Sequence, residues 1–380
     1  MSTRLPLVPQ TAAAASRLCV YCPKMCRFSC PVSEATRSET VTPWGKMTML
    51  ALTAAAGRAP TVPEEAEALY ACSGCLRCQT YCTHENDVPA ALYAGRAAAV
   101  RAGVAPAAAV SVGAAFRARG SLEAIDLQSA ATRWTGPRKR GGVLFAGCEA
   151  LAREPHTIDA MLSATKALGV PLSVHTAAPL CCGRPLLEAG FAEAFAARAE
   201  RVATSLRTHA GGRAGRVVVL EPRCAETMVR HYASVGVELA LTVNTATTFL
   251  AQHLPAAPDR SPFPGHAVYH DACALARGLA ETEAPRELLK AAFAGGVHAP
   301  EGSDVLCCGA GGLMPRTLPL VAAGMARRLA QTLPAGADDM VVSASGACRR
   351  HLADVGTSVV DLVAVVSRWL AGGNKGVMHG

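Results

Sequence analysis

The stretch Cys72-Ser-Gly-Cys75-Leu-Arg-Cys78-Gln-Thr-Tyr-Cys82 carries four cysteines with the spacing C-x2-C-x2-C-x3-C. Thiolates at this spacing hold [4Fe-4S] clusters, three of them around one cube and the fourth on a neighbouring cube. A second set of four lies upstream, at Cys19, Cys22, Cys26 and Cys30. Together the two runs predict two cubanes and therefore an electron carrier.

The last cysteine of each run is expected to serve the cluster of the other run. The predicted ligands of one cluster are Cys19, Cys22, Cys26 and Cys82, and those of the other are Cys72, Cys75, Cys78 and Cys30. Pro31 follows Cys30, as is usual for the last cysteine of such a run, whereas Thr83 follows Cys82. This departure weakens the match only slightly.

Two other uses of these cysteines are less favoured. Zinc ribbons need only two C-x2-C pairs and have no use for a third and fourth cysteine in each group. A disulfide framework requires an oxidising compartment, but the N-terminus shows only Arg4 and no continuous apolar core of a secretory leader. We therefore expect a cytoplasmic protein that contacts the inner face of the cell membrane at most peripherally.

The composition narrows the classes of protein further. A chain of 380 residues can form two or three domains, and its low aromatic content of 4% suits helices packed through small side chains. The formal charge of +8 does not indicate nucleic-acid binding, because the basic residues are scattered apart from Arg138-Lys-Arg140. The nearest candidate for a membrane span, residues 102–116, is interrupted by Gly103, Pro106 and Gly113.

The first third of the chain is expected to consist of an arm, a helical domain and a linker. Residues 1–18 are predicted to be a loosely attached arm, residues 19–105 a ferredoxin-type 4Fe-4S domain, and residues 106–140 a linker rich in Gly, Pro and basic residues. Within the domain, helices are predicted at 46–56, 64–71 and 90–102.

The remainder of the chain contains an internal repeat, with copies at 141–258 and 265–375. Each copy has an apolar run that ends at a cysteine, a Cys-Cys-Gly motif, and a strand-like run before a last cysteine. The cysteines are Cys148, Cys181, Cys182 and Cys224 in the first copy and Cys273, Cys307, Cys308 and Cys348 in the second. The single and paired cysteines lie 33 and 34 positions apart, a match too regular for chance.

Short apolar runs alternating with helical patterns predict an α/β fold with a small parallel sheet in each copy. The predicted helices span 156–168, 191–206, 224–234, 318–333 and 347–355. Each cysteine then lies where a strand gives way to a loop or helix. Because ligands of open α/β sheets bind at the carboxyl ends of the strands, we expect the four cysteines of each copy to meet in a metal or redox site. Buried structural thiols are the alternative.

The order of a cysteine, Cys-Cys-Gly and a further cysteine, repeated after a two-cluster module, resembles the cysteine-rich (CCG) domains of heterodisulfide reductase and its relatives. These include the iron-sulfur subunits of glycolate oxidase, anaerobic glycerol-3-phosphate dehydrogenase and lactate-utilisation systems. The resemblance covers residues 19–370 and is fullest at Tyr269-His-Asp-Ala-Cys273, Ala284-Pro-Arg-Glu-Leu and Leu306-Cys-Cys-Gly-Ala-Gly-Gly312. It implies further iron-sulfur clusters at the CCG motifs.

The chain departs from that family pattern once in each copy. Where the family has C-x2-C, this sequence has Glu221-Pro-Arg-Cys224 and Ser345-Gly-Ala-Cys348. Four cysteines per copy still suffice for an ordinary cube, but the disulfide-splitting clusters of the family use the extra thiolate. A carboxylate is a poorer ligand for iron-sulfur clusters than a thiolate, so the first copy is predicted to hold the weaker cluster.

Some other polar residues adjoin the CCG cysteines. His231, His270 and His351 could tune a cluster through hydrogen bonds, although a surface or core role is more common for such residues. Arg184 could hold an anion at the start of a helix or form a surface salt bridge.

The sequence contains no dinucleotide-binding fingerprint, which would be G-x-G-x-x-G after a strand. The glycine-rich stretch Gly309-Ala-Gly-Gly312 follows cysteines and lacks this spacing. We therefore expect the catalytic flavin in a partner. The chain would be the iron-sulfur subunit of a flavin-dependent dehydrogenase of glycolate, lactate or glycerol-3-phosphate type, passing electrons from an FAD-linked partner toward a quinone or similar acceptor. The alternatives are a heterodisulfide, thiol or quinone reductase with its substrate at the CCG site, and a module that only binds a partner.

Overall fold

The computed structural model describes residues 11–55, 58–212, 215–255, 262–299, 304–333, 336 and 339–372. These residues divide into two compact units. Unit 1 takes the described residues of 1–118, 185–193 and 303–329, and unit 2 takes those of 119–184, 194–302 and 330–380. Unit 1 therefore combines the N-terminal third of the chain with the segment that carries Cys307 and Cys308.

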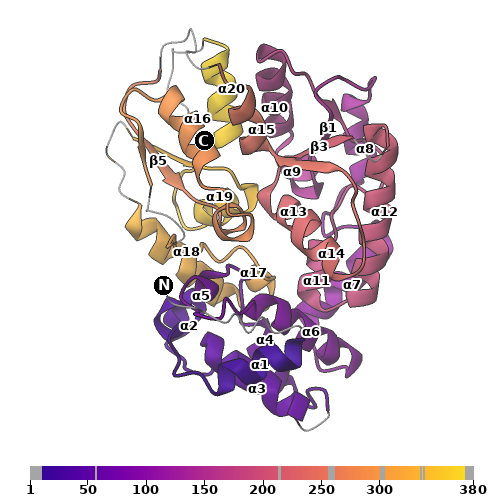
Figure 1. Ribbon diagram of the computed structural model, residues 1–380, viewed down its shortest axis with the longest axis vertical. Helices are drawn as coiled ribbons and strands as arrows, with labels where there is room; N and C mark the ends of the chain where they lie inside the picture. The colour runs from indigo at the N-terminus through magenta and orange to yellow at the C-terminus, as the bar shows by residue number, and fades with distance from the viewer. Residues whose placement is uncertain are drawn as a thin grey trace, which may run out of the picture. The chain divides into compact units, whose positions relative to one another are not determined.

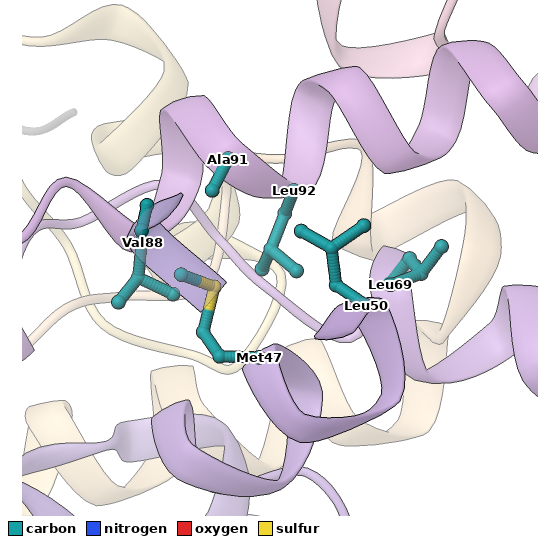
Figure 2. Close-up of a cluster of buried hydrophobic side chains, with 7 residues drawn as sticks. Met47, Leu50, Leu69, Val88, Ala91 and Leu92 are labelled. Atoms are coloured by element: carbon teal, nitrogen blue, oxygen red, sulfur yellow. The ribbon is translucent and has the colours of Figure 1, made fainter. Parts of the chain in front are cut away.

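Unit 1 is helical and its core is formed by α1 (Ala12–Val20), α3 (Pro43–Ala55), α4 (Pro63–Tyr70) and α6 (Val88–Arg101) (Figure 1). The side chains of Thr11 and Asp87 begin α1 and α6 by accepting hydrogen bonds from backbone N–H groups of the first turn. Figure 2 shows the apolar side chains that pack between α3, α4 and α6: Met47, Leu50, Leu69, Val88, Ala91 and Leu92.

Other helices of unit 1 are shorter or flank this core. They are η1 (Arg27–Ser29), α2 (Pro31–Thr36), α5 (Arg77–Thr80), α7 (Ala107–Arg119), α11 (Arg184–Ala189), α17 (Met314–Thr317) and α18 (Pro319–Thr332), of which α7, α11 and α18 extend slightly into unit 2.

The structure differs from two expectations about the N-terminal third. Residues 12–18 of the expected arm belong to α1, which packs against α3 and α6, while residues 1–10 lie outside the described residues. The expected linker contains α7 and α8 (Leu127–Ala131). Helix α7 was not predicted, because its alanines, valines and Gly113 form no distinct apolar stripe along one face of the helix. It packs through small residues, since a Cβ on Gly113 would lie 2.5 Å from the ring of Phe191.

Unit 2 contains two four-stranded parallel sheets with equivalent strand orders, which confirms the predicted α/β repeat. The first sheet has the order β2-β1-β3-β4, formed by β1 (Val143–Phe145), β2 (Ser173–Val174), β3 (Arg216–Val219) and β4 (Thr242–Thr245). The second has the order β6-β5-β7-β8, formed by β5 (Ala267–His270), β6 (Val297–His298), β7 (Met340–Ser343) and β8 (Val360–Asp361).

Helices cover these sheets and join the two copies. Helix α10 (Pro155–Ala167) packs against α20 (Leu362–Leu370), and α15 (Ala246–His253) packs against α16 (Glu283–Ala292), so each pair takes one helix from each copy (Figure 1). The predicted helix at 224–234 consists of α13 (Pro222–Glu226), the π-helical turn η3 (Thr227–His231) and α14 (Tyr232–Ser234). The remaining helices are η2 (Thr132–Trp134), α9 (Cys148–Arg153), α12 (Ala192–Ala210), η4 (Ala274–Gly278) and α19 (Gly346–Ala353).

Candidate functional site

The first cysteine run lies at helix ends in unit 1. Cys19 belongs to the last turn of α1, and the backbone N–H of Cys22 donates to its carbonyl at 3.0 Å. Cys26 directly precedes η1, and Cys30 directly precedes α2, where Pro31 takes the first helical position. Each thiol therefore projects from a helix boundary, where the chain can bend around a cofactor.

The second run follows α4 in a tight loop. Gly74 and Leu76 adopt left-handed backbone conformations with φ of 73° and 60°, which turn the loop around Cys75. Cys78 lies in α5, and the N–H of Cys82 donates to the carbonyl of Gln79 just after that helix. A pocket beside this loop is lined by Lys46 and by four cysteines: Cys72, Cys75 and Cys78 of the loop and Cys30 of the first run.

The thiols that influence one another's pKa belong mostly to the same predicted set of four cluster ligands. Burial raises the pKa of Cys19 to about 12, and the neighbouring Cys26, Cys82 and Cys22 raise it further, against a hydrogen bond from Asn86 that lowers it. Burial also raises the pKa of Cys78 well above its usual value, and Cys75, Cys72, Cys30 and, least of these, Cys26 of the other group contribute. Close thiolates repel one another until a cation joins them, so each group of four suits an iron-sulfur cluster. The ligand assignment itself stays a prediction.

The first CCG set converges within unit 2. Cys148 begins α9 just after β1, Cys181 and Cys182 precede α11, and Cys224 lies in α13 just after β3. The sulfurs of Cys148 and Cys181 are 3.4 Å apart. Hydrogen bonds from Cys181 and Cys224 lower the pKa of Cys182 well below its usual value. The four thiols therefore form one contiguous buried group that can stabilise a negative charge.

Glycines allow this convergence. Gly147 has a φ of 84°, and a Cβ there would lie 3.3 Å from the sulfur of Cys224. Gly183 has a φ of 87°, and a Cβ there would lie 2.7 Å from Arg198. A side chain at either position would strain the backbone, and it would crowd the thiol of Cys224 at Gly147 and the side chain of Arg198 at Gly183.

The second CCG set is divided between the units. Cys273 follows β5 and Cys348 lies in α19, both in unit 2, whereas Cys307 and Cys308 belong to unit 1. Within unit 1 the sulfur of Cys307 lies 3.5 Å from Oγ of Ser73. A Cβ on Gly312 would lie only 1.9 Å from the carbonyl oxygen of Cys72. The glycine run therefore lets the Cys307-Cys308 loop approach the loop of the second cysteine run.

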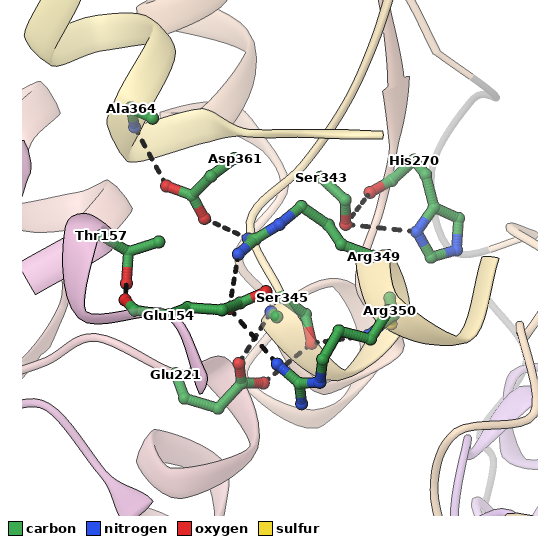
Figure 3. Close-up of polar contacts among 12 residues, drawn as sticks. Glu154, Thr157, Glu221, His270, Ser343, Ser345, Arg349, Arg350, Asp361 and Ala364 are labelled. Carbon is green, nitrogen blue, oxygen red and sulfur yellow. Dashed lines mark hydrogen bonds and ion pairs between the residues drawn. The ribbon is translucent and has the colours of Figure 1, made fainter. Parts of the chain in front are cut away.

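The residues that replace cysteine in the two copies bind each other (Figure 3). Oγ of Ser345 donates to the carboxylate of Glu221 at 2.8 Å, and the N–H of Gly346 donates to the same carboxylate at 2.9 Å. Nearby, Arg349 forms buried ion pairs with Asp361 and, at 2.7 Å, with Glu154. Glu221 therefore joins the two copies, and its carboxylate is engaged by Ser345 and Gly346.

The other polar residues singled out in the sequence also have local partners. Arg184 is buried and forms an ion pair with the equally buried Glu226, so the salt-bridge interpretation holds in a buried rather than a surface form. His270 is the last residue of β5 and places Nδ1 3.3 Å from Oγ of Ser343 on the neighbouring β7, and His351 lies 3.8 Å from Asp354. His231 is buried in η3. These contacts fit structural roles for the histidines.

Two functional candidates carried no motif in the sequence. Lys46 is buried beside Cys30, and Arg96 is buried beside the carbonyl of Cys72. Both lie in ordinary helical patterns, so only their packing identifies them. Among the described residues, no three histidine, cysteine or acidic side chains are arranged to hold a single metal ion, whereas a cubane takes each thiolate on a different iron atom.

Comparison with known proteins places these sites in recognised domains. A model of the 4Fe-4S dicluster domain matches residues 15–86, and a model of the cysteine-rich domain matches residues 143–229 and 267–353. The CCG matches contain the cysteines of both copies. No helix among the residues that the structure describes is long and apolar enough to cross a membrane.

Two curated relatives carry similar sequences. The chain is 26% identical over 291 residues to one subunit of the fumarate reductase (CoM/CoB) of Methanothermobacter marburgensis, and the match covers 76% of this chain and 57% of that protein. It is 27% identical over 182 residues to lactate utilization protein A of Shouchella clausii, and the match covers 46% of this chain and 74% of that protein. The chain thus spans little more than half the length of the first relative.

Proposed function

Because the chain is an iron-sulfur protein with a 4Fe-4S dicluster domain followed by two cysteine-rich (CCG) domains, we propose that it is the electron-transfer subunit of a flavin-dependent dehydrogenase of glycolate, lactate or glycerol-3-phosphate type. It receives electrons from an FAD-linked partner and passes them toward a quinone or a similar acceptor. The protein works in the cytoplasm and contacts the inner face of the cell membrane at most peripherally.

The observation that carries this proposal is the contact between two cysteine loops in unit 1. Cys307 touches Ser73, the neighbour of the predicted cluster ligand Cys72, and Gly311 and Gly312 press against the same loop. Within unit 1, a cluster in the pocket of Cys30, Cys72, Cys75 and Cys78 and the paired thiols of Cys307 and Cys308 would therefore be separated only by packed protein. Such an arrangement suits transfer between carriers better than chemistry on a bulky substrate.

When bound, the clusters supply one-electron reduction and oxidation. The protein's own residues hold the thiolates and set their surroundings. Arg96 fixes the loop by donating to the carbonyls of Cys72 and Gly312 at 3.0 and 3.4 Å. Tyr232 fixes the first CCG motif by donating to the carbonyl of Cys182 at 2.9 Å.

The test begins with anaerobic reconstitution. We expect about eight iron atoms and eight sulfides from the N-terminal cysteines, with more from the CCG sites. The dithionite-reduced protein should be reoxidised rapidly by a soluble quinone analogue and slowly by a heterodisulfide. Stoichiometric zinc without acid-labile sulfide would overturn the proposal.

A second candidate, reduction of a thiol or disulfide substrate at the first CCG site, rests on the sulfur chemistry of that site. The lowered pKa of Cys182 gives it thiolate character, and the relative from M. marburgensis carries CoM/CoB in its name. Rapid reoxidation by a heterodisulfide that disappears in Cys182→Ala would favour this candidate over electron transfer to a quinone.

A further inference from the structure

A lysine is buried against the second group of cysteines. Lys46 lies in the first turn of α3, is only 1% exposed, and places Nζ 3.5 Å from the sulfur of Cys30. No carboxylate among the described residues pairs with Lys46.

A buried arginine of helix α6 contacts the loop that carries Cys72. Arg96 is fully buried and donates only to backbone carbonyls, those of Leu69, Cys72, Glu188 and Gly312. Its guanidinium also stacks near the rings of Tyr70 and Tyr93. Among the described residues no carboxylate neutralises it.

Two buried cations without an acidic partner are costly in a protein interior unless an anion lies nearby. The thiols of Cys30 and Cys72 are the groups in position to supply that charge. A cubane with four thiolates carries about two negative charges, so the two cations match the group that the dicluster domain implies.

The first group of cysteines has different surroundings. Cys19, Cys22, Cys26 and Cys82 are all partly exposed, whereas in the second group Cys30 and Cys75 are buried and only Cys72 and Cys78 are partly exposed. The side chain of Asn86 donates to the sulfur of Cys19 at 3.1 Å. This amide is neutral. The nearest lysine in the run, Lys24, stacks on the ring of Trp44 at 3.9 Å and is itself partly exposed.

We propose that Lys46, supported by Arg96, determines the order in which the two N-terminal clusters are reduced, so that an incoming electron rests on the cluster of Cys30, Cys72, Cys75 and Cys78. This inference rests on the proposed function, because it assumes that both groups hold clusters. Reduction adds one electron and breaks no bond, with the reduced flavin of the partner as the donor.

Two effects oppose each other at this site. Burial by itself makes the added electron unfavourable. It would therefore leave the cluster of the more buried second group of cysteines harder to reduce than the cluster of the first group. A cation a few ångströms away in a medium of low polarity acts more strongly and is little screened by salt. The buried charges therefore reverse the order that burial alone would give.

The test is a redox titration followed by electron paramagnetic resonance of the full-length, reconstituted protein. We expect Lys46→Met to change the equilibrium constant for electron transfer between the two clusters at least about tenfold. This corresponds to a change of about 59 mV in the difference between their reduction potentials for a one-electron step. Lys46→Arg, which keeps the charge, should restore most of the difference. The matched control Lys24→Met should shift the titration little, and high salt should abolish that small shift but not the effect at Lys46.

Each outcome separates this inference from the proposed function. If wild-type protein shows no cubane signals, the proposed function fails. If both signals are present and Lys46→Met titrates like the wild type, only the role of Lys46 fails.

If Lys46→Met does not retain its clusters, serine variants of the predicted ligands show which cluster is reduced first. The signal that appears first during reduction of the wild type should be altered by Cys30→Ser. Alteration of that first signal by Cys82→Ser instead would overturn the inference.

Discussion

The two cysteine-rich copies share strand order, sheet geometry and cysteine spacing, yet their CCG motifs have different neighbours. In the first copy Cys148, Cys181, Cys182 and Cys224 all meet within unit 2. In the second copy Cys307 and Cys308 belong to unit 1, where they lie beside the loop of Cys72 and Ser73. The comparison teaches that a duplicated motif can keep its fold while it acquires a different partner.

The residues that follow each CCG motif explain the difference. After the first motif Arg184 turns inward and pairs with Glu226 in a buried salt bridge. After the second motif come Ala310, Gly311 and Gly312, and the missing side chains allow close backbone contact with Ser73. The first motif is therefore tied to its own domain and the second to the 4Fe-4S domain.

The largest expected effect comes from removing one cysteine of each pair. Cys308→Ala should abolish electron flow from a reduced flavoprotein to a quinone analogue, because the second motif adjoins the loop of Cys72. Cys182→Ala should lose iron from the first copy but leave more of the flow. Iron content and quinone reduction measure both variants. The comparison breaks if Cys182→Ala abolishes flow while Cys308→Ala leaves iron and flow unchanged.

The contact at Gly312 provides a second test. Gly312→Ala would place a Cβ 1.9 Å from the carbonyl of Cys72 at a φ of 66°, so we expect a loss of about 3 kcal/mol in stability and disturbance of the adjacent cluster signal. The matched control is Gly356→Ala, which has a φ of 87° but nothing within 4 Å and should cost only about 1–2 kcal/mol. Equal thermal stability of the two variants would contradict a tight contact at Gly312.

The bond between Glu221 and Ser345 can be measured with a double-mutant cycle. Glu221→Ala, Ser345→Ala and the double variant should give a coupling energy of about 2 kcal/mol, because the bond is buried and involves a carboxylate. Ser111→Ala on the exposed face of α7 is the control and should change stability by less than about 0.5 kcal/mol. Additive effects at the two sites would show that this bond does not join the copies.

The smallest expected effect is a pH dependence of Glu221. Burial, with a contribution from the nearby Glu149, raises its pKa from the usual 4.5 to about 7, although the hydrogen bond from Ser345 lowers it. The folded protein therefore holds this proton at pH values where the unfolded chain has lost it, so the contribution to stability falls as the pH rises from about 4.5 to 7.

This dependence is open to a direct comparison. Between pH 5.5 and 7 the thermal midpoint of the wild type should fall by about 2 °C relative to Glu221→Gln, which cannot titrate. A constant difference between the two proteins over this range would show that Glu221 is already ionised at pH 5.5.

The sequence by itself determined the iron-sulfur chemistry, the repeat and the parallel α/β fold. The spacing of the cluster ligands is a local property of the sequence. The alternation of strands and helices is local too, because hydrophobic periodicity can be recognised within short windows of the chain. For the same reason the helices α4 and α10 begin within a residue of their expected positions, at proline residues in both cases. Helix α7 was not predicted because close packing of small residues leaves little periodicity.

Only the tertiary structure decided which groups surround the cysteines. Glu221 and Ser345 are 124 positions apart, and Cys307 and Ser73 are 234 positions apart, so no local pattern could pair them. Lys46 and Arg96 read as ordinary helical residues until folding buries their charges beside the thiols. Spacing along the chain selects the kind of cluster, but the long-range packing of charges and backbone carbonyls around it decides its environment, because electrostatic interactions depend on distance in space and on burial.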